Sequence, residues 1–330
     1  MTKTRPARPP TARPPSAPTE RSTDDLVATG KTRPGRTWSL AAVAGAVLVV
    51  LALALVWRGF SNLRENDAPR SGGIQPIAQL ESPDVHSLLI DPADPDRVLF
   101  GSHSGIQESR DGGYTWQTGG LKNTDAMSLS ASPKEGATLY AAGHDVFSVS
   151  RDSGETWEPV RHDLPGTDIH AFAQDPFDPN RLFAYVVGAG VLTSMDGGVR
   201  WTPLATQPPD GGSQIALATN GSGLYATTTT GLAVSVDRGT SWQPTRAQPG
   251  GVISLAAPAD DPRLLYAGTP NGLVKSADGG TTWTPIGPRD VTVVVAVATT
   301  PTATGRVLFV TQTGALYRSD DAGATWREPR

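Results

Sequence analysis

The sequence predicts an all-β protein, a six-bladed β-propeller preceded by a single transmembrane helix. Two observations predict this fold. The eight-residue pattern S-x-D-x-G-x-x-W occurs six times, and Trp38–Trp57 is an uncharged apolar run of 20 residues. The aspartates of the pattern recur every 41 to 44 residues, a spacing that indicates a repeat architecture. These aspartates are Asp111, Asp152, Asp196, Asp237, Asp278 and Asp321.

Each copy of the pattern is expected to form a tight turn between two strands. The Gly that follows the aspartate by two positions allows a positive φ, and the short carboxylate can accept hydrogen bonds from the amides of its own turn. The Trp then opens the next strand and buries a large apolar surface between neighbouring sheets. Six of the eight Trp residues hold this position. We therefore interpret the pattern and its aspartates as structural.

The six copies, beginning with SRDGGYTW at 109–116, resemble the Asp-box, or bacterial neuraminidase repeat, of sialidases, other glycoside hydrolases and non-enzymatic propellers. A closer resemblance, to bacterial membrane-anchored glycosyl-hydrolase-like proteins, is carried by the segments DVHSLLIDPADPDRVLFGSHSGI and AAGHDVFSVSRDSGETW. Photosystem assembly factors and sortilin-type receptors also use Asp-box propellers, for binding proteins or peptides. The resemblance therefore implies the fold, and leaves hydrolysis and binding both open.

The residues before the propeller divide into three parts. Residues 1–37 are Pro-rich and carry eight Lys/Arg against three acidic residues, which predicts a disordered basic tail. Residues 38–57 are long enough to cross a bilayer as a helix, with a Trp at each end. The positive-inside rule places the tail in the cytoplasm and the propeller outside it, at the cell membrane, with 58–78 as a tether. A cleavable signal peptide is the alternative.

Composition narrows the classes of partner and site. The chain has no cysteine, which excludes disulfides and thiolate metal sites. Residues 71–330 carry 17 Lys/Arg against 27 Asp/Glu. This acidic balance argues against nucleic acid as a partner, because phosphate binding needs a basic surface.

The propeller is expected to occupy residues 79–330, as six blades of four antiparallel strands. In the first blade, 85–90, 97–102 and 105–109 are the first three strands and Trp116 opens the fourth; residues 75–80 are a candidate extra strand at an outer edge. The starts of the innermost strands share one edge with the ends of the second strands, and we call this edge the upper face. The S-x-D-x-G-x-x-W turns fall on the opposite, lower face.

Histidines gather on one half of the predicted upper face. His86 and His170 begin the innermost strands of blades one and three, where blade two has Met127. His103 and His144 follow the second strands of blades one and two at equivalent positions. An aspartate precedes each of the three inner-strand positions by two residues: Asp84, Asp125 and Asp168. Blades four to six carry aliphatic residues at these positions.

Three interpretations of this cluster remain open. Its side chains line a wet funnel, or form a metal site of His86, His144, His170 and Met127, or perform acid–base chemistry through a His–Asp pair. Imidazole suits zinc or copper, and a thioether favours copper. Asp84, Asp125, Asp168, Arg161 and His103 are the predicted ligand-binding residues.

Sialidase chemistry is not expected, because the sequence has no R-I-P motif and no Glu beside a plausible nucleophilic Tyr. A glycosidase that uses two carboxylates remains open. The sequence therefore predicts a membrane-anchored, extracytoplasmic propeller that binds a glycan or protein ligand on its upper face, with a glycoside hydrolase as the alternative.

Overall fold

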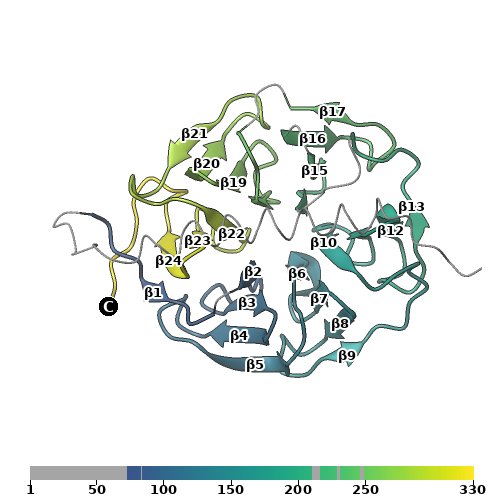
Figure 1. Ribbon diagram of the computed structural model, residues 1–330, viewed down its shortest axis with the longest axis horizontal. Coiled ribbons are helices and arrows are strands. Elements are labelled where there is room, and N and C mark those ends of the chain that lie inside the picture. The colour runs from purple at the N-terminus through teal and green to yellow at the C-terminus, as the bar shows by residue number, and fades with distance from the viewer. Residues whose placement is uncertain (1–72, 83, 210–215, 229–230, 246–248) are drawn as a thin grey trace, which may run out of the picture. The chain divides into compact units, whose positions relative to one another are not determined.

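The computed structural model describes residues 73–82, 84–209, 216–228, 231–245 and 249–330. These residues form six four-stranded antiparallel sheets arranged around a central axis (Figure 1), which confirms the predicted six-bladed propeller. The predicted tail, membrane helix and most of the tether lie outside the described residues. Within the described part of the chain, no helix is both long and apolar enough to cross a membrane.

The strands of each blade run outward from the axis in chain order, except in blade six. Blade one contains β2 (Val85–Ile90), β3 (Val98–Ser102), β4 (Gly105–Ser109) and β5 (Gln117–Lys122). Blade two contains β6 (Ser128–Ala131), β7 (Leu139–Gly143), β8 (Val146–Ser150) and β9 (Glu158–Pro159). Blade three contains β10 (Ile169–Gln174), β11 (Leu182–Val186), β12 (Gly190–Ser194) and β13 (Thr202–Pro203).

The second half of the ring repeats this arrangement. Blade four contains β14 (Leu217–Thr219), β15 (Leu224–Thr228), β16 (Gly231–Ser235) and β17 (Gln243–Pro244). Blade five contains β18 (Ser254–Ala256), β19 (Leu265–Thr269), β20 (Gly272–Ser276) and β21 (Thr284–Ile286). Blade six contains β22 (Val294–Thr299), β23 (Val307–Thr311), β24 (Ala315–Ser319) and β1 (Ala78–Gln79).

Blade six closes the ring with a strand from the other end of the propeller. Ala78 and Gln79 of β1 pair with Leu316 and Ala315 of β24. The extra outer strand expected near residues 75–80 is thus confirmed, and the sheet begins one residue before the predicted boundary at 79. Trp326 does not open a fourth strand as the repeat pattern suggested, because the edge of β24 is already paired with β1.

Apolar side chains fill the space between neighbouring blades. Between blades six and one, Ile90, Phe100, Leu308 and Leu316 are almost completely buried. Trp116 meets Phe100 edge to face, with ring centroids 5.3 Å apart. The Trp of the repeated pattern therefore packs as predicted.

The repeated aspartates hold their own turns on the lower face. Asp111 Oδ1 accepts hydrogen bonds from Ser109 Oγ at 2.8 Å and from the amides of Tyr114 and Thr115 at 3.0 and 2.9 Å. Gly112 and Gly113 both have positive φ. Hydrogen bonds from the following Thr or Ser side chain and amide lower the pKa of the equivalent carboxyls to about 2 at Asp152, Asp237 and Asp321.

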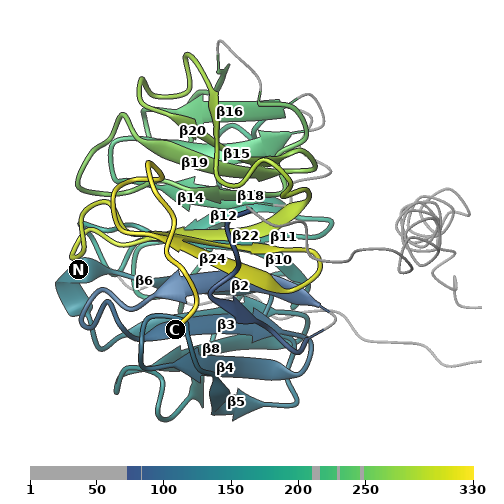
Figure 2. The ribbon, with the colours of Figure 1, turned by 90° about the vertical axis from the view of Figure 1, so that its left-hand side faces the viewer.

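Ion pairs on the lower side tie blades together. Arg306 of blade six reaches Asp96 of blade one at 3.0 Å. In blade one, the buried Arg97 binds Glu108 at 2.7 Å and lies 3.8 Å from Glu155 of blade two. Figure 2 shows the ring from the side, with the strands running between the two faces. The lower face carries these structural contacts around a cavity of about 160 Å³ at the lower end of the channel, lined by residues such as Pro133, Pro176 and Pro301. The histidines lie on the upper face, which carries the candidate site.

Candidate functional site

Two hairpin tips present histidines on the upper face. His103 and Ser104 join β3 to β4, and His144 and Asp145 join β7 to β8. These two-residue loops are the tightest connections between antiparallel strands, and Asp145 accordingly has a positive φ of 56°. The two imidazoles occupy equivalent positions in adjacent blades.

Two β-bulges present the other histidines. The pairing of β2 with β3 shifts register between Val85 and Ser87, and that of β10 with β11 shifts between Ile169 and Ala171. His86 and His170 are the extra residues at these shifts. A bulge re-aims a side chain, so both imidazoles leave the regular alternation of their strands.

In blade one, the bulge histidine meets the hairpin histidine. His86 Nε2 lies 3.0 Å from His103 Nε2, with the rings edge to face. The other nitrogen of His103, Nδ1, lies 2.9 Å from Asp125 Oδ2. Asp125 belongs to the connection from blade one to blade two, and its side chain is only 14% exposed.

The same arrangement recurs between blades two and three. His144 Nδ1 lies 2.7 Å from the same Asp125 Oδ2, and His144 Nε2 lies 3.0 Å from His170 Nε2. Asp168 adds a carboxylate, with Oδ1 at 3.0 Å from His144 Nε2 and 2.8 Å from His170 Nε2. We call the whole set the histidine–aspartate array: His86, His103, Asp125, His144, Asp168 and His170.

Asp125 lies between the two hairpin histidines. Its Oδ2 is 2.9 Å from Nδ1 of His103 and 2.7 Å from Nδ1 of His144, so the Nδ1 side of each ring faces the carboxylate and the Nε2 side faces away from it. A histidine that donates one nitrogen to a carboxylate and offers the other is the usual arrangement of a metal ligand.

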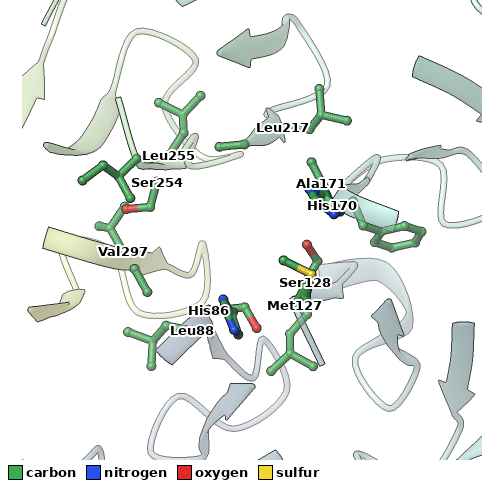
Figure 3. Close-up of a pocket in the computed structure, with 16 residues that line it drawn as sticks. His86, Leu88, Met127, Ser128, His170, Ala171, Leu217, Ser254, Leu255 and Val297 are labelled. Carbon is green, nitrogen blue, oxygen red and sulfur yellow. The ribbon is translucent and has the colours of Figure 1, made fainter. Parts of the chain in front are cut away.

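The array borders the upper mouth of the central channel. A cavity of about 110 Å³ there is lined on one side by His86, Met127 and His170, and on the other by Leu217, Leu255 and Val297 (Figure 3). The cavity has room for a handful of water molecules, not for a sugar or peptide chain. A larger ligand must therefore contact the rim.

Burial perturbs one member of the array. Loss of solvent lowers the pKa of His86, and the neighbouring His103 adds to this, while Asp125 and Asp84 act in the opposite direction. His86 is therefore held more firmly in its neutral form than a histidine in water.

The structure divides the residues predicted for one metal site between two groups. His86 lies with His103 and Asp125, whereas His144 and His170 lie with Asp168. Met127 lines the cavity with His86 and His170 and belongs to neither group.

The other predicted ligand-binding residues differ in position. Asp125 and Asp168 lie within the array. Asp84 and Arg161 are exposed, and no ion pair within the described residues joins them to it. The fifth histidine, His162, packs edge to face on Phe147, away from the array.

Sequence reasoning missed the bridging role of Asp125 and the three serines, Ser87, Ser128 and Ser254, that line the cavity. His103 and His144 hold equivalent positions in the repeat, and the connection that contains Asp125 passes both of their hairpins. These two facts together could have indicated that Asp125 contacts both histidines. A serine within an innermost strand was a signal for the cavity.

Solved structures with a similar fold include a glycoside hydrolase, YCF48 and a chain of a nidogen/laminin complex. A GH74 xyloglucanase from Xanthomonas campestris is 18% identical, with a TM-score of 0.52, covering 75% of this chain and 53% of that one. YCF48 from Cyanidioschyzon merolae is 18% identical, with a TM-score of 0.52, covering 78% and 88%. A chain of a nidogen/laminin complex is 13% identical, with a TM-score of 0.51, covering 65% and 84%.

These likenesses show the propeller fold. The chain spans about half the length of the xyloglucanase. No family model and no curated protein matches the sequence.

Proposed function

We propose that this chain is a binding module that recognises a protein ligand on the upper face of its propeller. The observation that carries the proposal is the asymmetry of the rim. Six ionisable side chains from blades one to three form one array, while the far side of the cavity is aliphatic apart from Ser254. A surface with directional polar groups beside an apolar wall suits recognition of a peptide segment.

The dimensions of the site support binding at the rim. The cavity is too small for a polymer, and the array side chains remain partly exposed above it: His103 48%, His144 44% and His170 34%. The nidogen/laminin complex is an instance of this fold in a protein that associates with another, which agrees with this proposal.

The proposal also assigns the binding module a cellular location. Trp38–Trp57 anchors the chain in the cell membrane, with the basic tail in the cytoplasm and the propeller outside it. The repeated S-x-D-x-G-x-x-W turns are Asp-boxes of the neuraminidase-repeat type. Their aspartates stabilise the blades and take no part in recognition.

A photo-crosslinking experiment tests the proposal. A benzophenone amino acid replaces Arg161, exposed beside the upper face, or Arg238, exposed in a lower-face turn, in the full-length chain in its native membrane. We expect a discrete protein adduct from position 161 that is lost in a His144→Ala background, and none from position 238. Adducts from position 238 alone would contradict the proposal, as would hydrolysis of xyloglucan oligosaccharides by the purified chain.

A further inference from the structure

We infer that His144, Asp168 and His170 bind one divalent first-row transition-metal ion. Each offers one atom to a common point: Nε2 of the two histidines and Oδ1 of the aspartate. The sides of the triangle formed by these atoms are 2.8, 3.0 and 3.0 Å. We call these three residues the triad.

The size of the triangle fits a metal ion. Three adjacent ligands of an octahedral ion at about 2.1 Å lie about 3.0 Å apart, whereas tetrahedral ligands at the same distance lie about 3.4 Å apart. The triad therefore matches one triangular face of an octahedron, with two imidazoles and one carboxylate. Such a face leaves three coordination positions for water or a ligand group.

The carboxylate oxygen supplies a second observation. Asp168 Oδ1 is inaccessible to solvent and receives no hydrogen bond of acceptable geometry in the described structure. Both imidazole Nε2 atoms nevertheless lie within 3.0 Å of it. The two Nε2 atoms lie in hydrogen-bonding geometry with each other, and neither is aligned with the oxygen. The three atoms surround a common centre, since each lies within 3.0 Å of the other two. A cation at that centre would satisfy the oxygen and both nitrogens together.

The orientation of His144 agrees with this assignment. Asp125 Oδ2 lies 2.7 Å from its Nδ1, so Nε2 is the nitrogen that is left for the metal. Asp125 is thus a positioning residue and not a ligand.

Blade one contains the equivalent positions but not the same site. Asp84 precedes His86 as Asp168 precedes His170, yet Asp84 is exposed and forms no ion pair within the described residues. Asp125 is already bound to Nδ1 of His103. His86, His103 and Asp125 form a second group of potential ligands, and Asp125 Oδ1 is also buried without a partner. Within the described residues no ion pair joins a carboxylate to His86, whereas Asp168 pairs with both histidines of the triad. Blade one therefore provides comparison positions within the same molecule.

The ligand atoms select the class of metal. Imidazole nitrogens favour Zn²⁺, Ni²⁺, Co²⁺ or Fe²⁺ over Mg²⁺ and Ca²⁺, which prefer oxygen. Met127, whose thioether sulfur would favour copper, lines the neighbouring cavity together with His170. The triad side chains are 34 to 48% exposed, so the ion would face solvent and the proposed ligand.

The experiment is titration of the metal-free, full-length chain in detergent with Zn²⁺, with Ni²⁺ and Mg²⁺ as comparison probes, by isothermal titration calorimetry. We expect one Zn²⁺ per chain and no Mg²⁺ binding. His144→Ala, His170→Ala and Asp168→Asn should each weaken Zn²⁺ binding by about 100-fold or more. The equivalent changes in blade one, His103→Ala, His86→Ala and Asp84→Asn, should alter it by less than about threefold.

Two further readouts keep the result interpretable. Thermal unfolding of each metal-free variant shows whether the propeller is intact, and electron paramagnetic resonance of a Cu²⁺-loaded sample counts the coordinating nitrogens, with two expected. Absence of Zn²⁺ binding by the folded wild type would overturn the inference. So would unchanged binding in Asp168→Asn, or an equal loss in the blade-one variants. Ligand crosslinking that persists without metal would leave the proposed function standing while the metal site fails.

Discussion

A β-carbon at position 143 would lie 1.9 Å from the carbonyl oxygen of Asp125, so glycine is the residue that fits there. The same constraint acts from the neighbouring blade, where a β-carbon at Gly101 would lie 2.2 Å from the carbonyl oxygen of Ala126. The connection that carries Asp125 is thus held between two glycines, which sets the position of the carboxylate under the two hairpin histidines.

Gly143→Ala is expected to displace Asp125 and weaken the site. The added methyl group forces the backbone of residue 125 away, at a cost of about 1–3 kcal/mol in the free energy of unfolding. Zinc affinity should fall by about 10–100-fold, because the hydrogen bond that fixes His144 is lost. Urea unfolding and calorimetry measure both. Gly166→Ala is the control, since its β-carbon would lie 3.3 Å from Val186; equal effects of the two changes would refute the clamping role.

The buried pair of Arg97 and Glu108 is expected to dominate the stability of the first two blades. Burial acts to raise the pKa of Glu108, but hydrogen bonds from Arg97, Gln117 and Arg110 outweigh it, and the pKa is lowered. Arg97→Met leaves this carboxylate buried without its main partner, and should cost about 3–5 kcal/mol.

Two comparison variants test that expectation by chemical denaturation. Arg110 forms the exposed side of the same network, so Arg110→Ala should cost less than about 1 kcal/mol. The double variant Arg97→Met, Glu108→Leu should recover only part of the loss, since the buried Asp91, 3.9 Å from Arg97, still loses its cationic neighbour. A single Arg97→Met variant as stable as the wild type would show that the pair contributes little.

The pairing of β1 with β24, which we call the seam, should be essential to the stability of the propeller. Ile77 is 5% exposed and packs in the cluster that contains Leu308 and Leu316. Ile77→Ala should therefore destabilise the propeller by about 2–4 kcal/mol, whereas Gln75→Ala, at an exposed position, should have little effect. Calorimetric unfolding distinguishes the two. Equal melting temperatures would mean that β1 is dispensable.

Stability should fall on acidification in two separate ranges. The folded-state pKa of His86 is lowered from 6.5, so its contribution is complete above pH 6.5 and is lost as the pH falls through the folded value. The turn aspartates, lowered from 3.8 to about 2, contribute fully above pH 3.8 and lose this contribution as the pH falls through about 2.

The variant His86→Gln separates these ranges. Its unfolding free energy should decline less than that of the wild type between about pH 7 and 5, and should decline in parallel near pH 3. The comparison uses urea titrations at each pH. A wild-type decline above pH 5 that His86→Gln leaves unchanged would assign the effect to another group.

The blades were predictable from the sequence because their turns are local. Each S-x-D-x-G-x-x-W copy contains the serine, aspartate, glycine and tryptophan that make the turn, and each hydrogen bond spans a few residues. Clustering of the histidines on one half of the face followed from their positions in the repeat.

The pairings within the site were not predictable in the same way. His86 meets His103 of its own blade, whereas His170, at an equivalent bulge, meets His144 of the preceding blade. The repeat pattern contains no signal for this difference. The bridge by Asp125 depends on side chains from two blades, and the seam joins residues at opposite ends of the propeller. Such contacts depend on the closed ring and not on neighbouring residues.

The composite blade six has a consequence for how the chain tolerates shortening. Its outermost strand precedes all the others in sequence, so removal of residues from either end of the propeller damages the same sheet. In blade six, therefore, one copy of the sequence repeat does not correspond to one blade. A chain with one repeat added or deleted would still have to place Ala78 opposite Leu316. The number of blades thus depends on the pairing of a single short strand.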